Sequence, residues 1–90
     1  MEKLISREKI KNELLSFLKK GNPLINKEKN LPMNKSLLEL GYIDSFGVIE
    51  IISYFEKKYK ISIQDNEITK EKFGSINKMI ALVSEKIKKI

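Results

Sequence analysis

The chain lacks the residue types on which most self-contained enzymes depend. Its 90 residues include no cysteine, no histidine and no tryptophan. Without cysteine there is no disulfide framework, no thiolate zinc site and no thiol nucleophile. Without histidine the chain lacks the commonest general base and the commonest metal ligand. We therefore predict that the chain is not an enzyme and holds no metal ion.

Long hydrophobic runs are also missing. A helix that crosses a bilayer needs about 20 apolar residues, and the longest mainly apolar segment, 46–55, is interrupted by Glu50. The first seven residues, Met-Glu-Lys-Leu-Ile-Ser-Arg, contain neither a signal-peptide apolar core nor a lipidation motif. We expect a cytoplasmic protein without a membrane span.

What is present is enough for one small folded domain. Apolar residues make up 41% of the chain and charged residues 33%, a balance typical of globular proteins. Because a domain usually takes about 100–200 residues, we treat 1–90 as a single domain. We expect it to be a monomer.

The net charge of +6 is unevenly distributed along the chain. Residues 1–20 and 76–90 each carry a net charge of +3, whereas residues 36–56 contain four acidic and no basic residues. Basic ends favour a helical nucleic-acid-binding module, which is one alternative function. The acidic centre and the single arginine, Arg7, argue against that alternative, so we expect no nucleic-acid partner.

Hydrophobic periodicity predicts three long helices, at 6–20, 45–59 and 76–89, and one short helix at 70–73. Serine or threonine precedes or opens most of these segments, as expected of helix caps. We predict an all-α four-helix bundle with a long loop, 21–35, between its first two helices. The residues expected to face the core are Ile10, Leu14, Phe17 and Leu18, then Val48, Ile52, Phe55 and Tyr59 widened by Ile49 and Ile51, and finally Ile76, Met79, Ile80, Val83 and Ile87.

The long connection contains two prolines, which argue against a continuous helix. We expect Leu24, Ile25, Leu31 and Met33 to anchor this loop to the core. Beyond it, Ser36 and Glu39 have the spacing of a capping box on one short turn, which Gly41 would end in a left-handed conformation. Residues 61–63 alternate like a strand but have no partner strand, so we interpret them as an extended connection.

Ser45 is the residue of most chemical interest, because it stands where the central helix is predicted to start. Unpaired N–H groups and the helix dipole make such a position suited to an anion, including a phosphate ester. A simpler interpretation is that Asp44 or Ser45 only caps the helix. A serine nucleophile needs an adjacent base, and the chain has no histidine, so Ser45 is better placed to be modified than to react unaided.

The segment from Leu37 to Glu50, with Gly41, Asp44 and Ser45 at its centre, resembles the attachment motif of acyl carrier proteins. The stretches 55–63, 67–69 and 73–76 are also similar to that family. The resemblance covers about residues 36–85 and implies an acyl-carrier-protein-like helical bundle. The pattern Gly-x-x-Asp-Ser-x-Gly looks like that of free-standing carriers served by an adenylating ligase, such as carriers of D-alanine or of specialised-metabolite precursors.

The resemblance implies that a phosphopantetheinyl transferase attaches a 4'-phosphopantetheine arm from coenzyme A to Ser45. The arm would carry an acyl or aminoacyl group as a thioester in fatty-acid, polyketide, nonribosomal-peptide or related biosynthesis. The implied partners are that transferase, an acyl- or aminoacyl-adenylating ligase and a downstream acyl transferase or synthase. Asp44 matches the family's aspartate that positions the transferase's magnesium.

Five residues are candidates for contact with partner enzymes. In the family, an acidic second helix faces basic partners, and the matching residues here are Glu39, Asp44, Glu50 and Glu56. Phe46 lies off the apolar stripe, so we expect it to contact a partner rather than the core. Tyr42 is interpreted either as an exposed aromatic beside the arm or as an anchor of its loop. A carrier-like adaptor that has no arm is the remaining alternative function.

Overall fold

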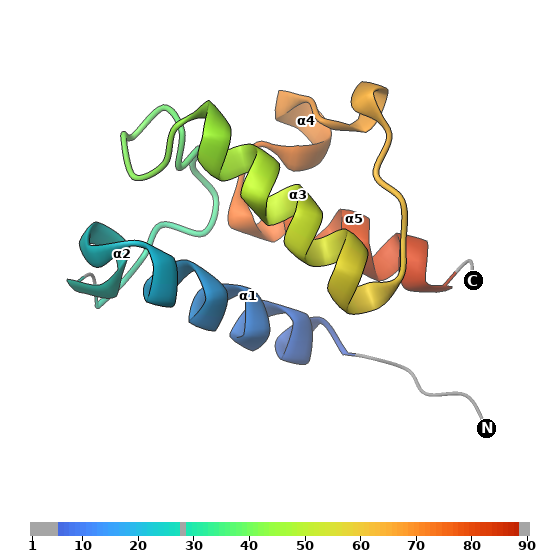
Figure 1. The fold of residues 1–90 in the computed structure, drawn as a ribbon, viewed down its shortest axis with the longest axis horizontal. Helices are drawn as coiled ribbons and strands as arrows, with labels where there is room; N and C mark the ends of the chain where they lie inside the picture. Colours follow the sequence, from blue (N-terminus) through green and yellow to red (C-terminus); the bar gives the residue numbers. More distant parts are fainter. Residues whose placement is uncertain (1–5, 28, 89–90) are drawn as a thin grey trace.

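The computed structural model describes residues 6–27 and 29–88, and within those ranges the chain contains helices and no strand (Figure 1). This confirms the predicted all-α class. The elements are α1 (Arg7–Gly21), α2 (Pro23–Lys27), α3 (Ser45–Tyr59), a 3₁₀ turn η1 (Asp65–Glu67), α4 (Lys70–Phe73) and α5 (Ile76–Lys88). The central helix has the predicted bounds. Residue 89, the predicted end of the last helix, lies outside the described residues.

The three long helices surround one core, with α3 crossing in front of α5 and α1 running beneath them in Figure 1. Phe55 on α3 is fully buried, and its ring meets Phe73 of α4 edge-on at 6.3 Å between centroids. The buried apolar residues are Ile10, Leu14, Leu18, Ile25, Leu37, Ile51, Phe55, Tyr59, Ile63, Phe73, Ile76, Met79, Ile80 and Val83. Most of the predicted core positions are therefore confirmed.

Side-chain caps fix where three helices begin, as the sequence predicts. The hydroxyl of Ser6 accepts a hydrogen bond from the Lys9 N–H at 3.2 Å. Thr69 accepts one from Lys72 at the start of α4, again at 3.2 Å. Ser75 accepts one from the N–H of Lys78 at the start of α5. Each bond satisfies one of the N–H groups that a helix start leaves unpaired.

The sequence prediction missed α2, a short helix inside the segment that we interpreted as a loop. Asn22 stabilises its start, because the side-chain oxygen accepts hydrogen bonds from the N–H groups of Leu24 and Ile25. Pro23 is the first residue of α2, a position where its missing N–H costs nothing. Ile25 is buried as predicted, but Leu24 is 58% exposed, so its expected anchoring role was wrong.

Ile49 was also assigned to the core wrongly, since 57% of its surface is exposed. Ile51, only two residues further on, is almost fully buried. Successive helical residues are rotated by about 100°, so a core-facing stripe cannot include both sides of the helix. Ile49 therefore belongs to the outer face of α3.

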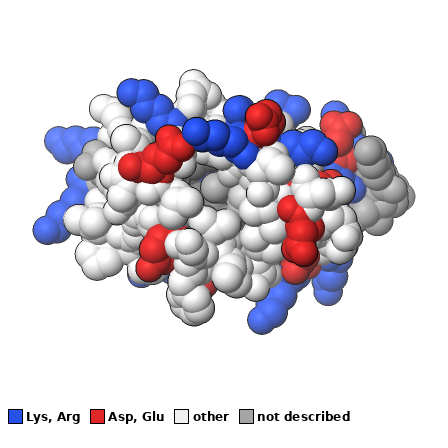
Figure 2. Space-filling view, turned by 90° about the horizontal axis from the view of Figure 1, so that it is seen from above, with Lys and Arg blue, Asp and Glu red and all other residues white. Residues whose placement is uncertain are grey.

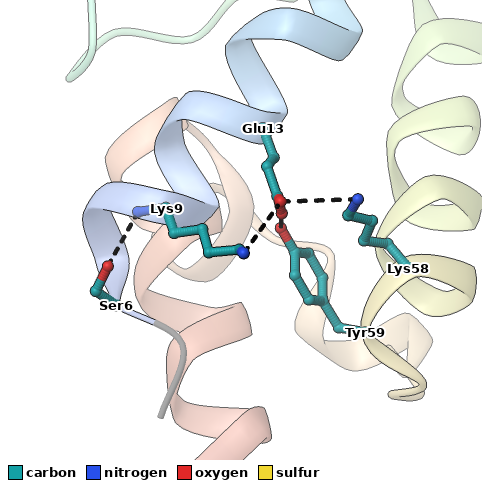
Figure 3. Close-up of polar contacts among 5 residues, drawn as sticks. All are labelled: Ser6, Lys9, Glu13, Lys58 and Tyr59. Atoms are coloured by element: carbon teal, nitrogen blue, oxygen red, sulfur yellow. Dashed lines mark hydrogen bonds and ion pairs between the residues drawn. The ribbon is translucent and has the colours of Figure 1, made fainter. Parts of the chain in front are cut away.

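A cluster of polar side chains joins α1 to the end of α3 (Figure 3). The Tyr59 hydroxyl donates a hydrogen bond to Glu13 Oε1 at 2.6 Å, and Lys58 Nζ lies 3.7 Å from Glu13 Oε2. Burial and the neighbouring carboxylate both disfavour the phenolate, so the pKa of Tyr59 is raised well above its usual value. The hydroxyl therefore stays protonated and continues to donate to Glu13.

Gly74 directly follows the last residue of α4, and its backbone is right-handed. Its φ is −82°, and a Cβ built there would collide with the backbone carbonyl oxygen of Lys70. We expect Gly74→Ala to lower the free energy of unfolding by about 1–3 kcal/mol, because backbone must move to admit the methyl group. Urea unfolding followed by circular dichroism measures this loss.

Gly21→Ala is the matched control for Gly74→Ala. Gly21 also ends a helix, but a Cβ there would meet nothing within 4 Å. The unfolding midpoint of Gly21→Ala should equal or slightly exceed that of the parent, because alanine restricts the conformations of the unfolded chain. Equal midpoints for the two variants would contradict the steric explanation for Gly74.

Candidate functional site

Ser45 is the first residue of α3, and its side chain is exposed. The capping role belongs to its neighbour: Asp44 Oδ1 accepts a hydrogen bond from the Gly47 N–H at 2.9 Å. The Asp44 carbonyl oxygen also accepts from the Val48 N–H at 3.2 Å. The helix start therefore does not depend on the Ser45 hydroxyl, which is accessible for modification.

The turn before Ser45 is fixed by hydrogen bonds to both sides. Gly41 has a φ of +83°, which confirms the predicted left-handed turn. The N–H of Tyr42 donates to the carbonyl oxygen of Leu37 at 2.9 Å. The Asn22 side-chain amide donates to the carbonyl oxygen of Tyr42, which ties this turn to the end of α1. Ser45 therefore lies where the end of α1, the turn before it and the start of α3 come together.

Tyr42 lies half-buried and packs against the core. Of its two sequence-based interpretations, this position favours the anchor of the loop over an exposed aromatic. The anchor contributes to holding the 37–44 turn against α1. The burial of this ring is a tertiary feature, since no local pattern marks it.

Three of the predicted partner contacts gather around Ser45. Asp44, Phe46 and Glu50 are all exposed, and Phe46 keeps 65% of its surface accessible. Phe46 is therefore outside the core, as its position off the apolar stripe predicted. These side chains lie on the first two turns of α3 or directly before it, so one surface could contact them together.

The other two predicted contacts are held by bonds within the chain. Glu39 Oε2 lies 2.8 Å from Lys70 Nζ, and this carboxylate raises the pKa of the Lys70 ammonium above its usual value. Glu56 is half-buried, and its Oε2 accepts a hydrogen bond from the Ile63 N–H at 2.9 Å. The structure thus places Glu56 three turns away from Ser45 and gives it a contact that holds the 61–63 connection.

Positive and negative side chains are mixed on the face of the molecule that Figure 2 shows. Figure 2 shows basic and acidic side chains interspersed there, with broad uncharged areas between them and no single acidic area. The pair of Glu39 and Lys70 illustrates the reason, since a lysine remote in sequence neutralises an acidic residue. Counting charges along residues 36–56 could not reveal such compensation.

The outer face of α3 carries a second stripe that sequence reasoning missed. Its side chains line an open groove of about 760 Å³ between α3 and α1. The groove residues are Phe46, Ile49, Glu50, Ser53, Tyr54, Lys57 and Lys58 on α3, together with Phe17 and Gly21 on α1. The spacing of three and four residues from Phe46 was the available signal. The groove is apolar near Ser45 and basic at its far end.

A second cleft, of about 520 Å³, lies between the end of α1 and the start of α3. Asp44 and Gly47, which flank Ser45 in sequence, both line it. The remaining lining residues are Phe17, Leu18, Gly21, Asn22, Gly41, Tyr42, Ile43, Glu50 and Ile51. The cleft therefore opens beside the candidate attachment residue.

Two kinds of feature are absent from the described part of the chain. Residues 6–27 and 29–88 contain no group of three or more acidic, histidine or cysteine side chains that could hold a metal ion. No helix in those ranges is both long enough and apolar enough to cross a bilayer.

Comparison with curated proteins decides which family these features belong to. The chain is 34% identical over 53 residues to a D-alanyl carrier protein of Streptococcus suis strain 98HAH33, covering 59% of this chain and 67% of that protein. The chain belongs to the carrier-protein family. A D-alanyl carrier protein of strain 05ZYH33 is 32% identical over the same lengths. One from Leuconostoc citreum strain KM20 is 27% identical over 87% of this chain and 96% of its own length.

These relatives define the role of the chain in general terms. No family model matches it, and no solved structure gives a significant match. The relatives are named as carrier proteins, which are not catalysts, and this agrees with the prediction that the chain is not an enzyme. The carrier role is favoured over the alternative of a nucleic-acid-binding module.

Proposed function

We propose that this carrier holds a small acyl or aminoacyl group as a thioester on a 4'-phosphopantetheine arm attached to Ser45. The observation that carries the proposal is the exposed Ser45 at the start of α3, next to a capping Asp44, in a chain of the carrier family. The relatives are named for D-alanyl groups, and this favours an aminoacyl cargo.

The residues around Ser45 fit a phosphate ester. Its hydroxyl is the acceptor for the arm, and the first turn of α3 presents N–H groups and the positive end of the helix dipole to a phosphate there. When attached, the arm supplies the thiol that forms the thioester. Such a thiol must come from outside the chain, because the sequence contains no cysteine.

The proposed partners are a phosphopantetheinyl transferase, an adenylating ligase and a downstream acyl transferase or synthase, acting in the cytoplasm. We assign their contacts to Asp44, Phe46 and Glu50, which surround Ser45 on the accessible surface. Glu39 is paired with Lys70, and we assign Glu56 mainly to the fold. Ile49 extends the apolar part of the contact surface along α3.

Intact mass spectrometry tests the proposal. The protein is incubated with coenzyme A and a phosphopantetheinyl transferase of broad specificity, with a known carrier protein as the positive control. We expect a gain of one phosphopantetheine. A folded protein that gains no mass, while the control carrier is modified, would instead support an adaptor without an arm.

Asp44 is proposed to act both as a helix cap and in positioning the transferase's magnesium, and two substitutions separate these roles. Asn caps helices about as well as Asp, so Asp44→Asn should leave the unfolding midpoint nearly unchanged but slow the transfer of the arm. Asp44→Ala removes the cap as well and should also cost about 1 kcal/mol of stability. The time course of the mass gain and urea unfolding measure the two effects.

If Asp44→Asn were modified at the parent's rate, the carboxylate would have no part in transfer, and capping alone would explain Asp44. Equal stability of Asp44→Ala and the parent would show that the bond to the Gly47 N–H contributes little.

A further inference from the structure

We propose that the arm on Ser45 folds back into the 520 Å³ cleft between the end of α1 and the start of α3, which we call the α1–α3 cleft. This inference rests on the proposed function, since it requires the arm to be attached. It assigns a binding site for the arm to the carrier itself, separate from any surface that the partner enzymes supply.

The position of the cleft places it within immediate reach of the arm. Asp44 precedes Ser45, Gly47 follows it by two residues, and both line the α1–α3 cleft. The cleft continues into the outer groove of α3, because Phe17, Gly21 and Glu50 line both. An arm leaving Ser45 can therefore enter the cleft without crossing another element.

Cleft size distinguishes this site from the small hollow between the 36–39 turn, α3 and α4. Small-molecule sites usually have about 300–1,000 Å³, and the α1–α3 cleft, at about 520 Å³, lies within that range. The hollow between the 36–39 turn, α3 and α4 has only about 190 Å³. It is lined mainly by apolar side chains, among them Leu37, Val48, Phe73 and Met79.

The chemistry of the lining also suits the arm. Pantetheine alternates amide and hydroxyl groups with short methylene segments, so it needs polar partners as well as apolar surface. The cleft offers the buried side chains of Leu18 and Ile51 together with the polar side chains of Asn22 and Glu50. A purely apolar cavity would leave the amides of the arm without hydrogen bonds, at a considerable cost.

The charge of the lining bears on the cargo. The lining includes two acidic side chains, Asp44 and Glu50, and no basic one. A cargo with a free ammonium group is favoured there over one with a free carboxylate, because opposite charges attract. This agrees with the aminoacyl cargo of the proposed function.

The absence of cysteine makes the arm easy to follow. In the arm-loaded protein the thiol of the arm is the sole thiol, so a maleimide nitroxide labels only its end. Paramagnetic broadening of backbone amide signals in a ¹⁵N-labelled sample then reports where that end lies. Chemical shifts of the unlabelled arm-loaded protein, compared with the unmodified protein, check that the label itself does not cause the docking.

Gly21→Leu is the variant that should close the site. A Cβ at Gly21 meets nothing within 4 Å and φ there is not left-handed, so a side chain can be added without strain at the position where the cleft meets the outer groove. Ser16→Leu is the matched control, since Ser16 is an exposed residue of α1 that lines neither the α1–α3 cleft nor the outer groove.

We expect the amides of Leu18, Gly21 and Asn22 to lose most of their signal intensity in the labelled protein, while those of Phe73 and Met79 keep theirs. Gly21→Leu should restore the Leu18 and Asn22 signals, and Ser16→Leu should not. Stronger broadening at Phe73 and Met79, or broadening that Gly21→Leu leaves unchanged, would overturn the inference. Failure of the proposed function is recognised separately, because the mass gain would then be missing.

Discussion

Ser45→Ala is expected to gain no phosphopantetheine under conditions in which the parent protein is modified completely. The substitution removes the one oxygen to which we propose the arm is attached. It should not disturb the fold, because Ser45 is exposed and Asp44 caps the helix. Alanine is also a better helix former than serine, so the stability of α3 should be kept or slightly raised.

Ser53→Ala is the matched control for Ser45→Ala. Ser53 is also an exposed serine of α3, two turns further along the same helix. This variant should gain the full mass of one arm at close to the parent's rate. A mass gain in Ser45→Ala that equals that of Ser53→Ala would place the attachment on another hydroxyl and would overturn the proposed site.

The start of α3 could be predicted because its determinants are local. An aspartate that caps, a serine that opens the helix and an apolar stripe all lie within a short stretch of sequence, and the predicted bounds of 45–59 agree with the structure. The same holds for the caps Ser6, Thr69 and Ser75. Local hydrogen bonds and periodicity were sufficient at these positions.

Features made by contact between distant segments could not be predicted in this way. The ion pair of Glu39 with Lys70 and the bond from the Ile63 N–H to Glu56 join residues that the sequence pattern does not relate. Both acidic residues therefore looked available to partners when only the sequence was considered. The short α2 was missed for a related reason, because its start depends on the side chain of Asn22 folding back onto the next turn.

The candidate site likewise has a part that local sequence determines and a part that depends on contacts between distant segments. Ser45 and Asp44 could be recognised from their sequence motif. The α1–α3 cleft beside them is assembled from the end of one helix, a turn and the start of another. Its existence follows from the packing of α1 against the 37–44 turn, which periodicity does not describe.

Phe55→Ala should have the largest effect on stability among the substitutions considered. Phe55 is fully buried, and its ring packs edge-on against Phe73. The centroids of the Phe55 and Tyr59 rings lie 6.2 Å apart. Truncation of Phe55 therefore leaves a cavity between α3 and α4. Replacing a buried phenylalanine by alanine costs about 3–5 kcal/mol. Because small domains have about 5–15 kcal/mol of total stability, this variant should be close to unfolding.

Phe46→Ala makes the same chemical change nine residues earlier on the same helix, where 65% of the side chain is exposed. Its unfolding free energy should stay within about 0.5 kcal/mol of the parent value, as for most surface substitutions. Loading by partner enzymes should instead become weaker, since we assign Phe46 to their contact surface. Urea unfolding and a loading assay thus separate the two phenylalanines of α3 by role. A large loss of stability in Phe46→Ala would assign it to the core, and the contact surface would have to be drawn without it.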